Sequence, residues 1–429
     1  MGEWRVYRLG EVAEIFDGPH ATPQKTEDGP VFLGISCLDN GRLDLSSAEH
    51  LSEDDYVTWT RRIRPEVGDV VFSYETRLGE AATVPTGLKC CLGRRMGLLR
   101  ARGDKVDSKF LLYAYLGKDF RQTIDERAIR GSTVDRIPLV TMAEFPIRLP
   151  VEASEQRAIA SVLSAMDDKI ALNRRMAATL EEMARALFKS WFVDFDPVRA
   201  KAEGRDTGLP SEIADLFPDR LVDSDLGELP AGWRTGSIYE IADVVYGAPF
   251  SSALFNTDGD GLPVIRIRDL KSESPGVWTT EIHPRGRLIR PGDLLVGMDG
   301  EFRCYLWSGQ EAWLNQRVCC LVPRNEIGSA FVRYSVSPRL AEIEASEVGT
   351  TVIHLGKGDI DLFRVVVPPP AVERAFTSLA GPLFAKGVAA RRGARALADL
   401  RDALLPKMVS GEIRIAEPEH FLARMEAVG

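Results

Sequence analysis

The sequence predicts an α+β protein made of two tandem mixed α/β domains, each followed by a long α-helix that pairs with the other. Three observations predict this fold class. The chain repeats itself, each copy ends in a long amphipathic block, and short apolar runs separated by glycine and proline precede each block. At ~150 residues per domain, a chain of 429 residues is long enough for two or three domains.

Several motifs recur in the same order in the two halves. GEWRVYRLGEVAEIFDG (2–18) matches AGWRTGSIYEIADVVYG (231–247), and IRPEVGDVVF (63–72) matches LIRPGDLLVG (288–297). Later, LGRRM (92–96) matches LNQRV (314–318), and RGSTVDRI (130–137) matches VGTTVIHL (348–355). A duplicated domain is therefore expected.

The most similar blocks close the two halves. Residues 155–191 align without a gap to residues 372–408. In the first block, which Ser154 is expected to cap, apolar side chains recur in steps of three and four, with Asn173 in the same stripe. Such a stripe favours paired helices, although a helix lying on its own domain has the same pattern. At 1.5 Å per residue, each helix would be ~55 Å long.

The second long helix is expected to start late or to kink, because Pro382 and Gly387 lie inside it. Before each block the pattern is mixed. One helix is expected at 108–128 and its counterpart at 329–347. β-like runs are expected at 31–35, 70–72, 96–99 and 145–149, and at 264–267, 294–296, 318–322 and 363–367.

Composition narrows the class of protein. The chain is 45% hydrophobic and 27% charged, which is typical of globular proteins, and its net charge of −9 argues weakly against a nucleic-acid partner. Its six cysteines lack metal-binding spacing, so we expect reduced, mostly buried thiols. There is no signal-peptide pattern and no apolar run of ~18 residues, which predicts a cytoplasmic location.

The chain resembles the specificity (S) subunit of type I DNA restriction-modification systems over nearly its whole length. The resemblance rests on W-R-x-x-x-L-x-E-V/I with its closing glycine in each half, L-P-x-x-x-x-E-Q-x-A-I (149–159), LFKSWFVDF (187–195) and LLPKMVSGEIRI (404–415). It departs from the family at Val372-Glu373, where a Glu-Gln pair is expected.

The resemblance implies a division of the chain into two DNA-reading domains and two spacers. These are target recognition domain 1 (1–150), a central helical spacer (151–195), a linker (196–232), target recognition domain 2 (233–370), a C-terminal spacer (371–412) and a tail (413–429). The spacers would form an antiparallel coiled coil with pseudo-twofold symmetry. Two unlike domains would then face half-sites about one turn of double-stranded DNA, ~34 Å, apart.

The resemblance also implies partners and cofactors. Two methyltransferase subunits would grip the spacers, and two motor-nuclease (restriction) subunits would join for cleavage. No cofactor is expected on this chain; S-adenosylmethionine, ATP and magnesium are expected on the partner subunits. The chain itself lacks methyltransferase, ATP-binding and nuclease motifs, so we expect it to be non-catalytic.

Most candidate DNA contacts lie in loops at matching places in the two halves, whereas Arg77 and Arg303 lie near loops that do not match. For each residue the alternative is a plain surface turn. In the first half they are His20, Thr22, Lys25, Arg77, Arg94, Arg95, Arg130, Ser132 and Thr133. In the second half they are Phe250, Ser251, Ser252, Arg303, Gln316, Arg317, Thr350, Thr351 and His354.

Four aromatic residues crowd the end of the first long block: Phe188, Trp191, Phe192 and Phe195. Some should fill the junction with the neighbouring domain, and an exposed remainder would form a partner-binding patch. The alternative is that all four form a local core. For the whole chain, the alternatives are a self-sufficient nuclease or methyltransferase with degenerate motifs, and a scaffold that joins proteins without reading DNA.

Overall fold

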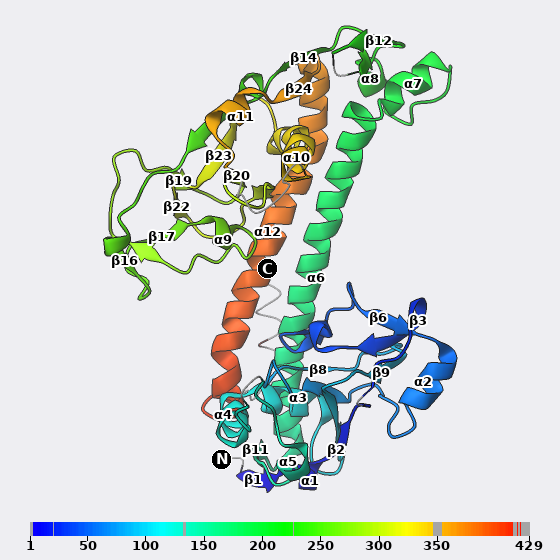
Figure 1. Cartoon of the computed structure of the whole chain (residues 1–429), viewed down its shortest axis with the longest axis vertical. Helices are drawn as coiled ribbons and strands as arrows, with labels where there is room; N and C mark the ends of the chain where they lie inside the picture. The colour runs from blue at the N-terminus through cyan, green and yellow to red at the C-terminus, as the bar shows by residue number, and fades with distance from the viewer. Residues whose placement is uncertain are drawn as a thin grey trace. The chain divides into compact units, whose positions relative to one another are not determined.

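The structure, a computed structural model, describes residues 3–19, 21–131, 134–225, 227–345 and 354–414 together with Pro418 and Phe421. The chain forms two compact units: unit 1 comprises Met1–Ile170 and Ala396–Gly429, and unit 2 comprises Ala171–Arg395. Two long helices, α6 (Ala153–Phe192) and α12 (Pro370–Val409), contribute to both units (Figure 1). Each unit therefore contains part of each long helix.

Unit 1 is built around a four-stranded antiparallel sheet in the order β2-β10-β7-β8. Its strands are β2 (Ala13–Asp17), β10 (Met96–Ala101), β7 (Val70–Ser73) and β8 (Ala81–Thr83). Smaller sheets pair β1 (Trp4–Arg8) with β11 (Pro146–Pro150), β4 (Leu38–Asp39) with β5 (Arg42–Leu43), and β3 (Lys25–Leu33) with β6 (Glu49–Leu51) and β9 (Cys90–Leu92). The unit's short helices are α1 (Leu9–Val12), α2 (Glu53–Trp59), α3 (Ser108–Leu116), α4 (Lys118–Arg127) and α5 (Leu139–Met142), with a 3-10 turn η1 (Ile35–Cys37).

Unit 2 repeats the central sheet in the order β15-β23-β20-β21. These strands are β15 (Ala242–Tyr246), β23 (Val318–Pro323), β20 (Leu294–Gly297) and β21 (Cys304–Leu306). The pair β14 (Arg234–Ser237) and β24 (Arg364–Val367) corresponds to β1 and β11, and β12 (Leu221–Ser224) pairs with β13 (Gly227–Pro230). The predicted duplication is thus present in strand order and pairing.

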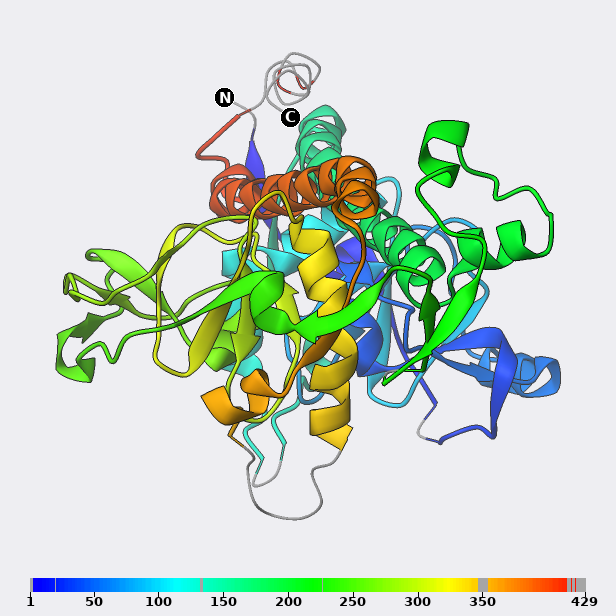
Figure 2. The same cartoon turned by 90° about the horizontal axis from the view of Figure 1, so that it is seen from above.

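A five-stranded sheet is the main addition in unit 2. Its order is β16 (Phe255–Asn256), β18 (Trp278–Thr279), β17 (Leu262–Ile265), β22 (Ala312–Leu314) and β19 (Leu288–Ile289). The green strands of this sheet lie on the side of unit 2 away from α12 (Figures 1 and 2). The unit's helices are α7 (Asp196–Ala202), α8 (Ser211–Ala214), α9 (Ile267–Leu270), α10 (Ser329–Ala345) and α11 (Lys357–Asp361), with 3-10 turns η2 (Ile238–Glu240) and η3 (Ser252–Leu254).

The long helices pair antiparallel within each unit. In unit 2, Asn173 of α6 faces Gly393 of α12, where a Cβ would lie 3.0 Å from the asparagine Nδ2. One turn farther along α6, the Ala177 carbonyl oxygen lies 3.9 Å from the Cβ position of Gly387, so the partner number falls as the α6 number rises. The predicted helix pair and the place of Asn173 in its seam are confirmed.

Unit 1 ties the same two helices together through a buried ion pair. Arg401 of α12 binds Asp167 of α6, with Nη1 and Oδ1 2.6 Å apart, and Tyr113 of α3 donates its hydroxyl to the same carboxylate at 2.7 Å. Asp167 is 5% exposed. Both charges of this pair are compensated, which burial requires.

A buried side chain at the start of each long helix holds that helix to its domain. The Gln156 Oε1 accepts from the Asp107 backbone N–H at 2.8 Å, and its Nε2 donates to the carbonyls of Lys105 and Pro150. In unit 2 the Glu373 Oε1 accepts from the Gly328 backbone N–H at 3.2 Å. We call the contacts of Gln156 and Glu373 the helix latches. Although Glu373 stands where the resemblance leads us to expect glutamine, it keeps one of the hydrogen bonds that Gln156 makes.

All six cysteines are free and buried, as predicted. Burial raises the pKa of Cys90, Cys91, Cys304, Cys319 and Cys320 to about 12, so these thiols stay protonated and unreactive at neutral pH.

Three predictions about helices are wrong. The helix expected at 108–128 is broken at Gly117, whose extended backbone (ψ 151°) ends α3 and begins α4. The first long helix begins at Ala153, so Ser154 lies inside it instead of capping it. The second does not start late: it begins at Pro370, because proline at the first turn costs no hydrogen bond, and Pro382 lies inside it.

Candidate DNA interface

The predicted loops of unit 1 meet at one end of the central sheet. Gly18, which follows β2, donates its backbone N–H to the Met96 carbonyl at 2.9 Å. A Cβ at Gly18 would lie 2.5 Å from the Gly93 carbonyl oxygen, so only glycine allows this approach. The loop that begins at Gly18 is therefore fixed against the turn that carries Arg94 and Arg95.

Arg95 is held at the centre of this loop cluster. Its backbone lies in the left-handed region at φ 74°, and its Nε lies 2.9 Å from the Glu75 Oε2. The Arg95 carbonyl accepts from the Tyr74 N–H, while Glu75 also forms a β-bridge with Arg136. Three segments separated in sequence are thus joined around one arginine.

Unit 2 repeats this arrangement residue by residue. The Arg317 Nη1 lies 3.3 Å from the Asp299 Oδ2, the Arg317 carbonyl accepts from the Met298 N–H, and Asp299 forms a β-bridge with His354. The Gly247 N–H donates to the Val318 carbonyl, as Gly18 does to Met96. The His354 Nδ1 lies 2.7 Å from the Asp299 Oδ1. Asp299 therefore brings together two predicted residues, Arg317 and His354.

The other predicted contacts are mostly exposed and tied to acidic neighbours. Lys25 pairs with Glu49, Arg130 with Asp135, Arg77 with Glu80, and Arg303 with Glu301. Ser251 donates its backbone N–H to the Glu281 Oε2 at 2.8 Å. The exposed residues without an acidic partner among the described residues are Thr22, Arg94, Ser252 and Gln316. His20, Ser132, Thr133, Thr350 and Thr351 lie outside the described residues.

One predicted DNA contact is corrected by burial. Phe250 is 7% exposed and packs against His283 and Trp313, with ring centroids 5.6 Å apart in both cases. Its ring belongs to the small core beneath β17, so it cannot stack on a base without unfolding that core.

The aromatic residues at the end of α6 are also corrected. Phe188, Trp191, Phe192 and Phe195 are each at most 7% exposed and belong to the main core of unit 2. The Phe192 ring contacts Phe331 and Phe376 at 5.0 and 5.1 Å between centroids. Because these rings are enclosed by their own unit, none is left to form an exposed patch, and the local-core alternative is confirmed.

The sequence interpretation missed the carboxylates of this region. Glu75 and Asp299 each lie two residues after the end of a central strand, and each binds the arginine of the neighbouring turn. The signal was present, because the strands before them, 70–72 and 294–296, had already been matched in the repeat. Only the basic and polar members of the turns had been considered.

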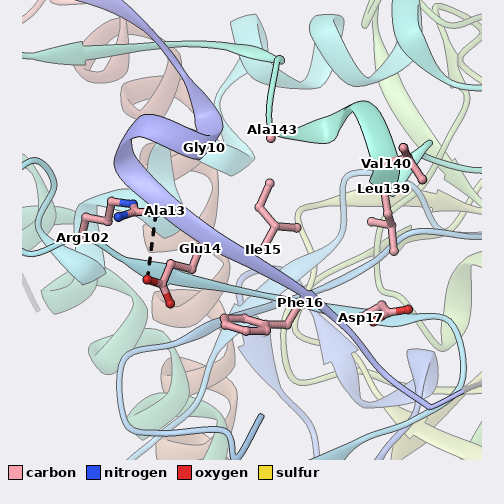
Figure 3. Close-up of a pocket in the computed structure, with 10 residues that line it drawn as sticks. All are labelled: Gly10, Ala13, Glu14, Ile15, Phe16, Asp17, Arg102, Leu139, Val140 and Ala143. Atoms are coloured by element: carbon pink, nitrogen blue, oxygen red, sulfur yellow. Dashed lines mark ion pairs between the residues drawn. The ribbon is translucent and has the colours of Figure 1, made fainter. Parts of the chain in front are cut away.

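A cleft of about 680 Å³ runs along β2 in unit 1, lined mainly by backbone and apolar side chains (Figure 3). Its only charged contact among the residues drawn is Arg102 with Glu14, 3.9 Å apart. No group of three potential metal-binding side chains was found among the described residues. Nor does any described helix have the length and apolar character to cross a membrane.

Comparison with known proteins shows which proteins this chain is similar to. Residues 1–182 match the model of the type I restriction modification DNA specificity domain. The chain is also 25% identical to the type I restriction enzyme MjaIX specificity subunit of Methanocaldococcus jannaschii. The 437 aligned residues cover 97% of this chain and 94% of that protein. The chain is thus similar to type I specificity subunits over most of its length.

Two other specificity subunits are also similar to this chain. The type I restriction enzyme HindI specificity subunit of Haemophilus influenzae is 24% identical over 333 residues, 66% of this chain and 72% of that one. The crystal structure of the type I restriction-modification S subunit from M. genitalium shares the fold, with a TM-score of 0.58 at 16% identity over 95% of this chain and 96% of that one. The matched model is described as a DNA specificity domain, and these relatives are named specificity subunits of type I restriction enzymes.

Proposed function

We propose that this chain reads an asymmetric, bipartite site in double-stranded DNA, with unit 1 recognising one half and unit 2 the other. The observation that carries the proposal is the duplicated loop cluster. Both units place an arginine, a carboxylate and a third polar residue at the same end of the same sheet. The backbone contacts are equivalent, whereas the third residue is Arg136 in unit 1 and His354 in unit 2, so the half-sites should differ.

The acidic total of the chain is compatible with this role. Most predicted cations in the loops are already paired with carboxylates, and a phosphate would have to exchange with those carboxylates. Such exchange makes phosphate binding weaker than that of free cations, so part of the phosphate neutralisation would come from partner subunits.

The proposed partners are methyltransferase subunits, two per complex, on the helical spacers, and two restriction subunits for cleavage. Exposed apolar side chains on the long helices support docking there. Leu172 and Met183 of α6 are 51% and 52% exposed, and Leu379 and Leu400 of α12 are each 41% exposed. This chain would be non-catalytic, and S-adenosylmethionine, ATP and magnesium would be bound by the partners.

The proposal is tested by co-expressing the chain with the methyltransferase subunit encoded beside it and mapping methylated adenines across a host genome. We expect a split, asymmetric motif. Exchange of residues 1–150 for the corresponding segment of a relative should replace one half of the motif and leave the other half unchanged.

Two results would contradict the proposal. A stable complex that methylates no motif would favour a scaffold, and a motif that changes in both halves after the exchange would show that the units do not read separately. DNA cleavage or methylation by the purified chain alone would favour the enzyme alternative.

A further inference from the structure

The turn after the second central strand in chain order has a left-handed residue at the same position in both units. It follows β7 in unit 1 and β20 in unit 2, and the residue after each carboxylate is left-handed: Thr76 at φ 70° and Gly300 at φ 76°. Threonine rarely adopts this region, so the turn in unit 1 persists against its own backbone preference. The turn places the two carboxylates, Glu75 and Asp299, at equivalent positions.

Each carboxylate engages one end of an arginine and leaves the rest for a second acceptor. Glu75 binds the Nε of Arg95, and among the described residues no other side chain binds that guanidinium. Asp299 binds the Nη1 of Arg317, which also lies 3.4 Å from the His354 Nδ1. The two arginine side chains are 41% and 56% exposed, so both remain accessible.

We propose that Glu75 and Asp299 are positioning residues that hold Arg95 and Arg317 for bidentate contact with a guanine, one in each half-site. This inference rests on the proposed function and adds the base that each arginine reads. Guanine presents two acceptors, O6 and N7, in the major groove, and the planar guanidinium fork matches them.

The carboxylate favours a base edge over a phosphate as the second acceptor. A phosphate brought to the same guanidinium would carry a full negative charge close to Glu75 or Asp299, and the two anions would repel each other. The edge of guanine is neutral, so it can share the arginine with a carboxylate. Fixing the guanidinium beforehand also reduces the side-chain entropy lost on binding.

The test measures base preference directly. The full chain in complex with its methyltransferase subunit selects sites from random double-stranded DNA, and the bound DNA is sequenced. Arg95→Ala should lower the preference for guanine at one position of one half-site by about 10-fold or more. Glu75→Gln should lower it by a few-fold at the same position. Asp299→Asn and Arg317→Ala should act in the same way on the other half-site.

Two further variants separate positioning from general damage. Arg95→Lys keeps the charge but loses the fork, so it should relax the same position as Arg95→Ala. Glu144→Gln breaks an exposed ion pair of similar geometry, with Arg8 Nη1 and Glu144 Oε2 3.0 Å apart beside the β1–β11 sheet, and should change no position. The double variant Glu75→Gln/Arg95→Ala should match Arg95→Ala alone, because the carboxylate acts through the arginine.

The inference is overturned if Glu75→Gln and Arg95→Ala relax different base pairs, if the shared pair is not G·C, or if affinity falls equally for all sequences. Those outcomes leave the split site of the wild-type complex intact. A wild-type complex with no sequence preference would instead overturn the proposed function, and the inference with it.

Discussion

The helix latch of each unit bonds the start of a long helix to its domain, but the two latches use different side-chain groups. In unit 1 the neutral amide of Gln156 accepts one hydrogen bond and donates two, and the side chain is 1% exposed. In unit 2 the carboxyl group of Glu373 accepts from Gly328 and Thr377 but has no donor when ionised, and burial raises its pKa. Duplication has therefore preserved the place of the latch while the charge at that place has changed.

The two segments of α6 also differ, because the first packs in the core of unit 1 and the second in the core of unit 2. The most damaging change in unit 2 should be Trp191→Ala, because Trp191 is 1% exposed among the rings of Phe217 and Phe376. Its removal should lower the free energy of unfolding of unit 2 by about 3–5 kcal/mol. Hydrogen exchange followed residue by residue should show lost protection in the core of unit 2.

The matched change in unit 1 is Met166→Ala, which removes a fully buried side chain from the core of that unit. It should cost about 2–5 kcal/mol there. Equal loss of protection in both units after either substitution would contradict the division of the chain into two cores.

The second prediction concerns the ion pair between the long helices in unit 1. Asp167→Asn should destabilise unit 1 by about 3 kcal/mol, since it leaves Arg401 buried beside a neutral amide. Arg401 also binds Asp402, which offsets part of the loss. Urea unfolding of the variant measures the effect. The control is Asp168→Asn, which breaks the exposed pair with Arg42 and should cost less than about 1 kcal/mol. Equal losses of stability in the two variants would show that burial does not make the Asp167–Arg401 pair more important than an exposed one.

The third prediction exchanges the latches. Gln156→Glu should destabilise unit 1 by about 2 kcal/mol at neutral pH, because the carbonyls of Lys105 and Pro150 lose their donor and face a buried carboxylate. Glu373→Gln should stabilise unit 2 at neutral pH, because burial costs a neutral amide less than it costs a carboxylate. Thermal unfolding of both variants checks the signs, and destabilisation by Glu373→Gln would show that the carboxylate suits its site.

The advantage of Glu373→Gln should depend on pH. Burial raises the pKa of Glu373 in the folded state, so the unfolded state ionises first as the pH rises. The free energy of unfolding of the wild type therefore falls from about pH 4.3, the ordinary value for glutamate, up to the raised folded pKa, and stays low above it. The difference between the variant and the wild type should be greatest at neutral pH and vanish below about pH 4.

The smallest expected effects lie where the helices approach each other in unit 2. Gly387→Ala should stabilise the unit by about 0.5–1 kcal/mol, because the new Cβ would meet only an ordinary contact at 3.9 Å. Gly393→Ala should gain less, because Asn173 lies 3.0 Å from the new Cβ and must move. Chemical unfolding compares the two, and a larger gain at position 393 would mean that Asn173 does not hold the seam.

Much of this architecture could be predicted because the chain carries two copies of it. Repeated motifs located the central strands and the long helices, and the heptad stripe placed Asn173 in the seam. The break at Gly117 was missed because a single glycine is tolerated inside many helices. The five-stranded sheet of unit 2 contains strands as short as two residues, too short for any periodicity to show.

The recognition loops were harder to predict than the fold. Loop position could be inferred from the repeat, but the fate of a side chain depends on what packs over it. Phe250 was expected to face DNA and is covered by Trp313 and His283, which are more than 30 residues away in sequence. Glu75 and Asp299 were missed because a search for DNA contacts favours cations, whereas the structure fixes two of those cations with carboxylates.

The divided chain of unit 1 has a consequence for synthesis in the cell. Met408 and Val409 are buried in the core of unit 1, so its first 170 residues cannot complete that core until the last helix has been made. The about 225 intervening residues form unit 2, and at ribosomal rates of ~5–20 residues per second they take roughly 10–45 s to appear. The first unit to leave the ribosome is therefore the last to finish folding, and it is exposed to proteases and chaperones throughout that interval.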